Sequence, residues 1–242
     1  MDATALSILG FAAVIAGGIA SIVGFGIGSV LTPTLSLWID AKLAVAAISI
    51  PHFIGTAWRF WLLKGRVDRR ALWSFGIPSA VGGLAGALLH NVATSPSLLV
   101  LLAVLLLFVA AGELTGVSRR LVFRGPAAWI AGALSGALGG LVGNQGGLRA
   151  GGLLGFHMDR DTFVATVTAI GLLVDTARMP VYVALYGREL SGMLTAIAVS
   201  TAAVIIGTIV GGRVLRRIPD NRFRGVVAVL LAILGIWLLT RV

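Results

Sequence analysis

The sequence contains no cysteine and few charged residues. Cysteine is absent from all 242 residues, which excludes disulfide bonds, thiolate metal ligands and a cysteine nucleophile. Charged residues make up 12% of the chain, about half the share of an ordinary soluble domain. The longest polar stretch runs from Arg213 to Arg224 and is too short to fold as a separate domain. These shortages exclude a conventional soluble protein.

Hydrophobic residues account for 58% of the chain, and the mean hydropathy is +1.02. These values are typical of an all-α polytopic membrane protein. No Lys or Arg precedes Lys42, so the first apolar stretch lacks the basic region of a cleaved signal peptide, and we expect it to stay in the mature chain. The net charge is +10, but the basic residues lie in short loops between apolar segments. Membrane topology explains this charge better than a nucleic-acid partner does.

Eight apolar segments approach the length of about 20 residues that one membrane crossing needs. They are Ala3 to Val23, Leu43 to Leu63, Ala71 to Leu89, Leu98 to Leu114, Ala127 to Val142, Phe163 to Tyr186, Leu190 to Gly212 and Val226 to Leu239. The first and fifth segments continue past glycine clusters to Ile39 and Met158. Both are longer than one crossing needs, which indicates a break in the middle of each.

Loop charge tests whether the two broken segments cross the membrane, because cytoplasmic loops collect Lys and Arg. Three loops are strongly basic, with Lys64, Arg66, Arg69 and Arg70 in the first, Arg119, Arg120 and Arg124 in the second, and Arg213, Arg216, Arg217, Arg222 and Arg224 in the third. Eight crossings would place the third loop on the opposite side from the other two. Re-entrant hairpins in place of the first and fifth segments bring all three loops to the cytoplasm.

An internal repeat supports this topology. A shift of 119 residues aligns both glycine clusters, Asp40 with Asp159, and Arg59 with Arg178. We therefore predict two inverted repeats, each a re-entrant hairpin followed by three transmembrane helices, with both termini outside. The first is 1–120, with hairpin 3–39 and helices 43–63, 71–89 and 98–114. The second is 121–242, with hairpin 127–158 and helices 163–186, 190–212 and 226–239. Secondary transporters commonly use this plan and bind substrate near the membrane midplane.

The glycine clusters carry a family resemblance. The stretches Gly24 to Pro33, GFGIGSVLTP, and Gly143 to Gly152, GNQGGLRAGG, resemble the glycine-rich hairpins of the TauE/SafE group of sulfite exporters, also called the TSUP family. The resemblance covers essentially the whole chain. It implies a prokaryotic inner-membrane transporter for a small sulfur-containing anion, such as sulfite, thiosulfate or an organosulfonate, with no cofactor.

The candidate substrate ligands lie mainly at the two hairpin tips. Helix N-termini there would aim backbone amides at an anion, and polar side chains would add donors. The candidates are Gly26, Gly28, Asn144, Gln145, Gly146, Gly147, Arg149, Arg178 and Arg59. Alternatives remain for several of them. Asn144, Gln145 and Arg149 could instead satisfy the backbone freed by the turn, Arg178 could pair with Asp175, and Arg59 could extend to the cytoplasmic surface.

Two further residues are candidates for a proton or ion-pair role. Asp175 is the deepest acidic residue of the sixth segment, and His52 lies next to Pro51 near the middle of the second segment. A buried histidine can also be purely structural. The scattered glycines Gly82, Gly83, Gly86, Gly207, Gly211 and Gly212 are typical of close helix packing. That packing could occur within one chain or between two, which leaves a homodimer open.

The function predicted from these observations is a secondary carrier that exports a small sulfur anion by alternating access. A passive anion channel is the first alternative, and the sequence does not separate the two. An intramembrane enzyme is the second alternative, from another class. The sequence has no His-Glu-x-x-His, no Gly-x-Ser-x-Gly and no paired intramembrane carboxylates, so we expect neither an enzyme nor a metal site.

Overall fold

The fold is a bundle of helices in every part of the chain that the structure describes. The computed structural model describes all residues except 118–122, 124, 145, 154–155, 215–219 and 241–242. Its helices are α1 (Ala3–Val23), α2 (Ile27–Leu35), α3 (Ala41–Leu63), the 3₁₀ turn η1 (Lys64–Arg66), α4 (Arg69–Ala71), the π-helical turn η2 (Leu72–Gly76), α5 (Ile77–Val92), α6 (Ser95–Thr115), α7 (Pro126–Val142), α8 (Gly146–Leu153), α9 (Arg160–Ser191), α10 (Leu194–Val214) and α11 (Asp220–Leu239).

The predicted class of an all-α polytopic membrane protein is confirmed. Six helical segments among the described residues are long and apolar enough to span a membrane, namely Ala3–Val23, Ala41–Arg66, Arg69–Val92, Ser95–Thr115, Arg160–Ser191 and Leu194–Gly211. The apolar helices Pro126–Val142 and Ala228–Leu239 are shorter. The outer surface suits lipid, since large apolar side chains such as Phe11, Val81 and Leu88 are 57–70% exposed.

One predicted boundary is wrong. We expected a loop at 187–189 and a new helix from Leu190, but α9 continues to Ser191 and α10 begins at Leu194. The polar residues Arg188 and Glu189 suggested a loop, yet both are good helix formers. Gly187, whose helical position is exposed, has open space around it and does not end the helix. The other predicted segments differ from the observed helices by a few residues at their ends.

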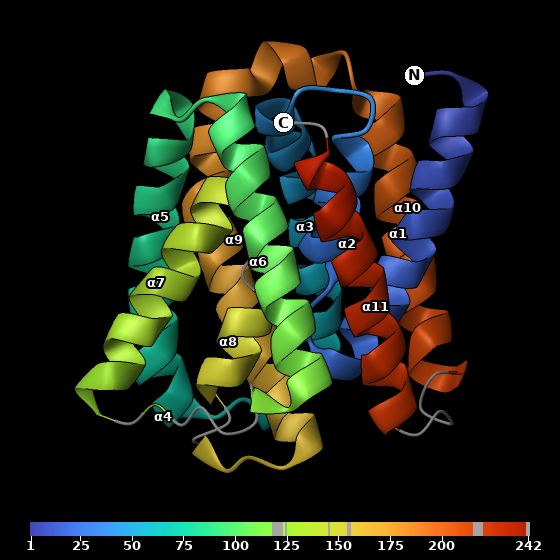
Figure 1. Cartoon of the computed structure of the whole chain (residues 1–242). Helices are drawn as coiled ribbons and strands as arrows, with labels where there is room; N and C mark the ends of the chain where they lie inside the picture. The colour runs from blue at the N-terminus through green and yellow to red at the C-terminus, as the bar shows by residue number, and fades with distance from the viewer. Residues whose placement is uncertain (118–122, 124, 145, 154–155, 215–219, 241–242) are drawn as a thin grey trace.

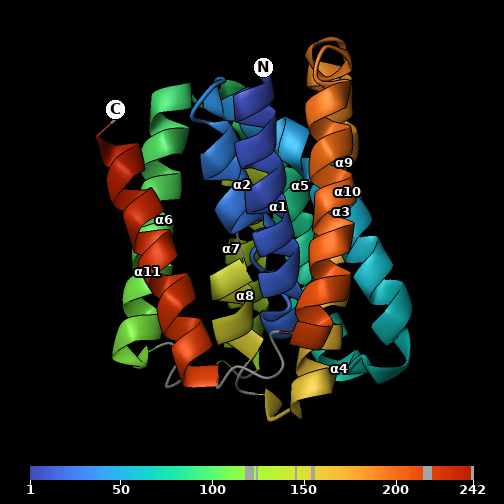
Figure 2. The same ribbon diagram turned by 90° about the vertical axis from the view of Figure 1, so that its right-hand side faces the viewer.

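The chain direction is plain in Figures 1 and 2. From its start, α1 descends, and α2 returns toward the end from which α1 came, whereas α7 rises from the opposite end and α8 returns to it. The starts of α4, α7 and α11 and the ends of α6 and α10 all lie at the lower end in Figure 1. The helix ends that flank the three basic loops therefore lie at one end of the molecule, and the start of α1 and the end of α11 lie at the other.

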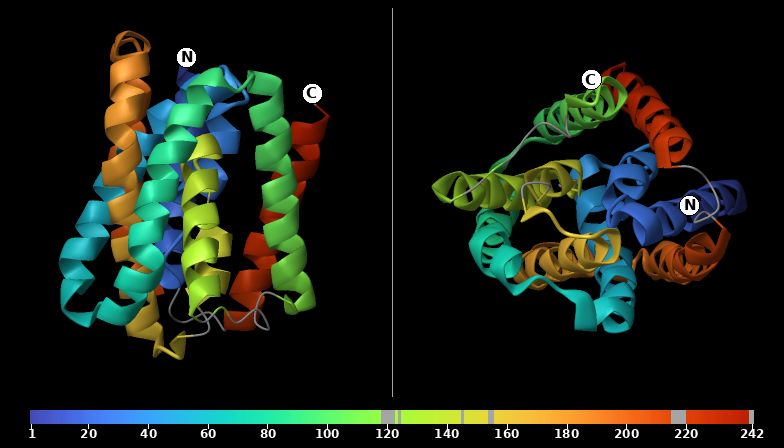
Figure 3. Two further views of the ribbon diagram at one scale, coloured as in Figure 1. Left: turned by 90° about the vertical axis from the view of Figure 1, so that its left-hand side faces the viewer. Right: turned by 90° about the horizontal axis from the view of Figure 1, so that it is seen from below.

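Helices from the two halves pack in pairs. Helix α1 packs against α10, α7 packs against α5, and α6 packs against α11, as the view from below in Figure 3 shows. Glycines allow the close approach in two of these pairs. A Cβ atom at Gly86 would lie 2.0 Å from the carbonyl oxygen of Ala137, and one at Gly207 would lie 2.0 Å from that of Val14. The predicted packing role of the scattered glycines is confirmed at these positions.

Helix boundaries recur at a fixed distance along the chain. The last residues of α1 and α7, the first residues of α2 and α8, and the first residues of α3 and α9 are each 119 residues apart: Val23 and Val142, Ile27 and Gly146, Ala41 and Arg160. This spacing is the offset at which the sequence aligns with itself. The two halves therefore break and restart their helices at corresponding positions.

Aspartates at corresponding positions begin α3 and α9. The Asp40 carboxylate accepts a hydrogen bond from the backbone nitrogen of Lys42 at 2.9 Å, and the Asp159 carboxylate accepts from the backbone nitrogens of Asp161 and Thr162, each at 3.1 Å. The Thr162 hydroxyl also donates to Asp159 at 2.6 Å. This hydroxyl, followed by the backbone amides, lowers the pKa of Asp159 below its ordinary value. Both residues are N-caps that fix the start of a long helix.

Candidate functional site

The tips of the two hairpins touch at the centre of the bundle. Helices α1 and α7 are capped at their C-terminal ends by Gly24 and Gly143, whose φ angles are +84° and +71°, a left-handed conformation that favours glycine. The chain turns there and begins α2 and α8. A Cβ atom at Gly28, in the first turn of α2, would lie 2.1 Å from the carbonyl oxygen of Gly143. Only a glycine at position 28 lets the two tips come this close.

A small cavity lies where the tips meet. Its volume is about 10 Å³, which is room for roughly one water molecule. It is lined by Gly24, Phe25, Gly26, Gly28, Ser29, His52, Thr56, Arg59, Gly143, Asn144, Gly146 and Arg149. The N-cap of α2 is Gly26, which has no side chain to cap the first amides of the helix. These amides therefore remain able to donate hydrogen bonds toward a ligand.

Arg149 reaches the cavity from α8. Its side chain is buried, and Nη1 donates to the carbonyl oxygen of Val167 at 3.2 Å. The other two nitrogens, Nε and Nη2, have no hydrogen-bond partner in the described structure. Gly171 on α9 makes room for this guanidinium, since a Cβ atom there would lie 2.7 Å from Nη1. Because a buried charge is normally hydrogen-bonded, Arg149 is prepared to bind an acceptor from outside the protein.

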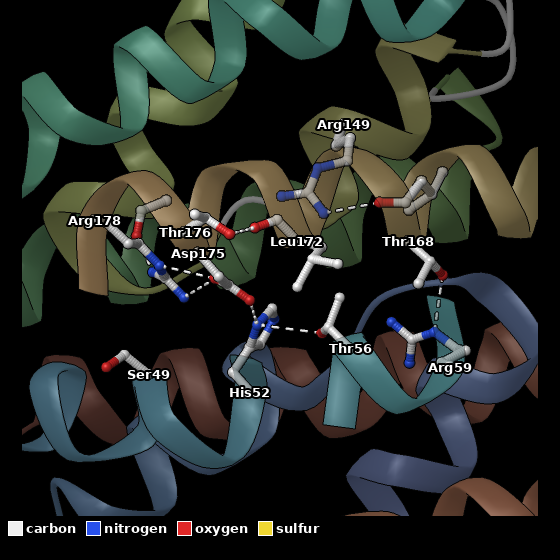
Figure 4. Close-up of polar contacts among 12 residues, drawn as sticks. Ser49, His52, Thr56, Arg59, Arg149, Thr168, Leu172, Asp175, Thr176 and Arg178 are labelled. Carbon is white, nitrogen blue, oxygen red and sulfur yellow. Dashed lines mark hydrogen bonds and ion pairs between the residues drawn. The ribbon is translucent and has the colours of Figure 1, made fainter. Parts of the chain in front are cut away.

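Arg59 reaches the cavity from α3. Figure 4 shows Arg59 and Arg149 on facing sides of the gap between α3 and α9. Arg59 donates from Nε to Thr168 Oγ1 at 2.8 Å and from Nη2 to the carbonyl oxygen of Gly24 at 3.1 Å. Nη1 has no partner among the described residues. The side chain is 3% exposed, so the expectation that it extends to the cytoplasmic surface is wrong.

Asn144 connects the two hairpins. Its Oδ1 atom accepts a hydrogen bond from the Ser29 hydroxyl of α2 at 2.8 Å. Its Nδ2 atom is buried and has no partner in the described structure. The sequence predicted Asn144 as a ligand but gave no reason to expect Ser29 beside it. The hydroxyl of Ser29 holds the oxygen of the Asn144 amide. The Nδ2 atom of Asn144 therefore remains available to donate a hydrogen bond to a ligand.

Three buried side chains around the cavity hold nitrogens that have no partner in the described structure and can only donate. They are those of Arg59, Arg149 and Asn144, and none of these groups can accept a hydrogen bond through nitrogen. Including Arg178, the buried cluster holds three guanidinium groups and a single carboxylate, that of Asp175. Its net charge is +2 when His52 is neutral. Unused donors and excess positive charge both favour an anion as the ligand.

Arg178 has a different role from Arg149 and Arg59. It donates from Nε to Asp175 Oδ1 at 2.9 Å, Nη2 forms an ion pair with the same oxygen at 2.8 Å, and Nη1 donates to the carbonyl oxygen of Gly139. All three nitrogens therefore have protein partners. Tyr182, one turn further along α9, donates to the carbonyl oxygen of Gly140. Arg178 does not line the cavity; together with Tyr182 it anchors the end of α7, just before the second hairpin tip.

His52 joins this network to the cavity. Its Nδ1 atom lies 2.6 Å from Asp175 Oδ2, and the Thr56 hydroxyl lies 3.5 Å from the same nitrogen. His52 also lines the cavity, so one edge of the ring faces the carboxylate and the other faces the site. Figure 4 shows His52 between Asp175 and Thr56. Asp175 and His52, which were separate candidates for a proton or ion-pair role, are thus in direct contact, a pairing that the sequence did not predict.

The remaining predicted ligands divide into those at the cavity and those elsewhere. Gly26, Gly28 and Gly146 line it. Gly147 faces α6 instead, because a Cβ atom there would lie 2.5 Å from Val109. Gln145 lies outside the described residues. Sequence reasoning missed Ser29, Thr56, Thr168 and Gly171, which are small residues in apolar helices and give no signal by themselves. Within the described residues, no three His, Asp or Glu side chains gather as metal ligands would.

Comparison with known proteins agrees with this geometry. The chain matches no curated protein and no solved structure significantly. The family model of the sulfite exporters TauE/SafE matches residues 9–238, which include both hairpin tips and every residue of the cavity. Apolar helices of membrane-spanning length and a buried cluster of anion-binding groups are what an anion transporter needs. The chain therefore belongs to the TauE/SafE family of sulfite exporters, which transport anions across membranes.

Proposed function

We propose that the protein is a secondary carrier that exports sulfite or a small organosulfonate by alternating access. The observation that carries this proposal is the set of unused donors on Arg59, Arg149 and Asn144 around one cavity. Each buried donor without a partner costs about 1–3 kcal/mol, and more when it is charged. An anion with three oxygens in a compact head group relieves several of these costs together. Sulfite and sulfonates have this shape.

The arrangement of the two halves suggests how the site opens to each side. Hairpin α1–α2 comes from the upper end and hairpin α7–α8 from the lower end in Figure 2. We propose that they belong to inverted repeats, 1–120 and 121–242, which place the substrate between facing tips. The pairing of α1 with α10 and of α7 with α5 supports this symmetry, because each hairpin packs on a helix of the other half.

The present cavity is closed to an anion. A volume of about 10 Å³ admits roughly one water molecule, so groups that line the cavity must move to admit sulfite. A larger cavity of about 260 Å³ lies at the lower end, lined by Ser21, Ile22, Leu63, Arg160, Asp161 and Val164. Gly24 lies close to this lower cavity, since a Cβ atom there would be 3.5 Å from the carbonyl oxygen of Val164. We assign the lower cavity as the cytoplasmic entrance.

The membrane potential supplies energy for export. One elementary charge crossing 100 mV corresponds to about 2.3 kcal/mol, and an inside-negative potential drives anions outward. In a prokaryotic inner membrane with both termini outside, the basic lower end of the molecule would face the cytoplasm. Export from that side therefore requires no sodium gradient.

Flux of labelled sulfite into proteoliposomes tests the proposal. We expect saturable flux that increases with a potential set to drive anions into the vesicles, and counterflow when unlabelled sulfite is present on the far side. Flux that neither saturates nor shows counterflow would indicate a passive channel. The double variant Arg59→Gln/Arg149→Gln removes both free guanidinium groups and should lose the flux. If flux persisted in that variant, the site would be elsewhere.

The topology has a separate test. Because the chain lacks cysteine, single cysteines can be introduced by Asp40→Cys and Asp159→Cys and labelled with a membrane-impermeant thiol reagent. Both positions are exposed. The inverted repeats predict that Asp40→Cys reacts from outside and Asp159→Cys from the cytoplasm. Labelling of both from the same side would contradict the re-entrant hairpins.

A further inference from the structure

We infer that His52 is a proton-binding site coupled to the anion, so that the carrier takes up a proton as it binds a doubly charged substrate. This inference rests on the proposed function, because it concerns the same cavity. Three histidines are present in the chain. His52 lines the cavity, whereas both ring nitrogens of His90 contact backbone carbonyls, those of Leu141 and Lys42, and His157 is exposed before α9.

The contact with Asp175 decides which nitrogen of His52 titrates. Asp175 accepts a hydrogen bond from Nε of Arg178 and forms an ion pair with its Nη2, which holds it as an anion that can only accept. Nδ1 of His52, 2.6 Å from that carboxylate, therefore carries a hydrogen whether the ring is neutral or charged. The proton that comes and goes is on Nε2. In the described part of the chain, Nε2 has no hydrogen-bond partner.

The Nε2 edge of the ring faces the place where the anion would bind. A Cβ atom at Gly28 would lie 3.7 Å from Cδ2 of His52, the carbon next to Nε2, so this edge faces the first turn of α2. A protonated Nε2 could donate to an anion held there by the amides of α2 and by Arg149. Protonation thus adds both a charge and a donor at the cavity, while Nδ1 keeps its bond to Asp175.

The surrounding charges make protonation depend on the anion. The ring faces Asp175 and Arg178 from α9, Arg149 from α8, and Arg59 from its own helix α3, and α2 contributes no charged residue. The arginines give the cluster its net charge of +2, which opposes a further proton. A bound dianion cancels that charge. By thermodynamic linkage, whatever favours the proton when the anion is bound favours the anion equally when the proton is bound.

This coupling sets what is carried. A dianion such as sulfite enters with one proton taken from water on the cytoplasmic side, and both leave together on the other side. The net charge moved per cycle is then one negative charge instead of two. A monoanionic sulfonate needs the proton less, because the cluster's net charge of +2 already exceeds the single negative charge of the sulfonate. His52 would therefore let one site carry both charge classes.

Proton uptake during binding tests the inference directly. The probes are thiosulfate, a dianion, and methanesulfonate, a monoanion, because neither changes charge between about pH 5.5 and 8, where an ordinary histidine titrates. Purified full-length protein in weak buffer with a pH dye should take up protons when thiosulfate binds, and fewer with methanesulfonate. The apparent affinity for thiosulfate should rise as pH falls, by at most about tenfold per pH unit, which is the limit for one linked proton.

Two variants assign the effect. In His52→Asn the amide can still donate to Asp175 from near the Nδ1 position, but no group replaces Nε2, so binding should persist without proton uptake and with a flat pH profile. His157→Asn is the matched control, since position 157 has φ +53°, which asparagine tolerates; it should behave as the unmodified protein. The carbon-13 shift of the His52 ring, followed by NMR, should report protonation when thiosulfate is added.

The outcomes separate this inference from the proposed function. If the unmodified protein bound neither anion, the anion site itself would be wrong, and this inference with it. If it bound thiosulfate without proton uptake, or if His52→Asn took up as many protons as the unmodified protein, the anion site would stand and the proton coupling would be wrong. An unchanged NMR shift of His52 upon binding would also contradict the coupling.

Discussion

The substitution Gly28→Ala tests whether contact between the hairpin tips creates the binding site. Gly28 is in the first turn of α2, where its φ angle is helical, so alanine is acceptable to the backbone. Its new methyl group would lie 2.1 Å from the carbonyl oxygen of Gly143. Because that oxygen belongs to the backbone of the other hairpin, no side-chain rotation can relieve the clash. The hairpins must move apart.

The size of the effect follows from this distance. Ordinary van der Waals contact begins at 3.4 Å, so the tips must separate by about 1.3 Å. The bond from Ser29 to Asn144, now 2.8 Å long, would then exceed hydrogen-bond length. Overpacking of this kind costs about 1–3 kcal/mol of stability. Without Ser29, the Asn144 amide is no longer held in place to donate to the anion. Loss of that one hydrogen bond to a charged ligand, worth about 1.5–3 kcal/mol, would weaken anion affinity by roughly tenfold to a hundredfold.

The assay is sulfite flux in proteoliposomes, with the melting temperature of the purified protein measured alongside. The control is Gly187→Ala, at an exposed helical position where a methyl group meets no atom within 4 Å; it should leave flux unchanged. Gly28→Ala should raise the KM for sulfite while the protein still folds. If Gly28→Ala transported sulfite like the control, contact between the tips would have no part in binding, and the reasoning from the cavity would fail.

Three further predictions concern neighbouring features. Gly171→Ala should weaken anion binding with little change in melting temperature, because its methyl group would displace the flexible end of Arg149; equal affinity would show that Arg149 is not a ligand. Arg66→Gln removes an ion pair with Asp161 in which both side chains are exposed, so the free energy of unfolding should fall by at most about 1 kcal/mol. A larger loss in denaturant titration would contradict this. The lowered pKa of Asp159 means that its cap stabilises α9 above the ordinary carboxyl pKa of about 3.9 and loses this effect as pH falls through the lowered value. Hydrogen exchange at the start of α9 should therefore accelerate in acid, and Asp159→Asn should abolish the acceleration.

The helices could be predicted because apolar length and turn chemistry act locally. The glycine clusters mark the breaks after α1 and α7, in agreement with the observed boundaries, and the predicted starts of α3 and α9, at 43 and 163, lie two and three residues after the observed ones. The end of α9 could not be predicted in this way. Its last turns contain Gly187, Arg188 and Glu189, which suit an exposed helix as well as a loop, and packing decides between them.

The ligands were harder to predict because Arg59 and Arg178 occupy corresponding positions of the repeat but have different surroundings. They differ because of the residue three positions earlier on each helix, which is Thr56 before Arg59 and Asp175 before Arg178. Positions 56 and 175 are themselves 119 residues apart. The carboxylate neutralises Arg178, whereas Thr56 leaves Arg59 with an unpartnered nitrogen. The sequence shows that Thr56 and Asp175 differ, but this difference changes the roles of the two arginines only because both are buried.

The same offset explains how a nearly symmetric frame makes an asymmetric site. His52 corresponds to Gly171, and Arg149 corresponds to Val30. A histidine at position 171 would occupy the space of the Arg149 guanidinium, which a Cβ atom there already approaches to 2.7 Å. The second half can therefore place its arginine in the cavity only because it lacks the histidine. Exchanging either residue for its counterpart would remove a proposed anion donor or the proposed proton site, so the proposed chemistry requires the two halves to differ at these positions.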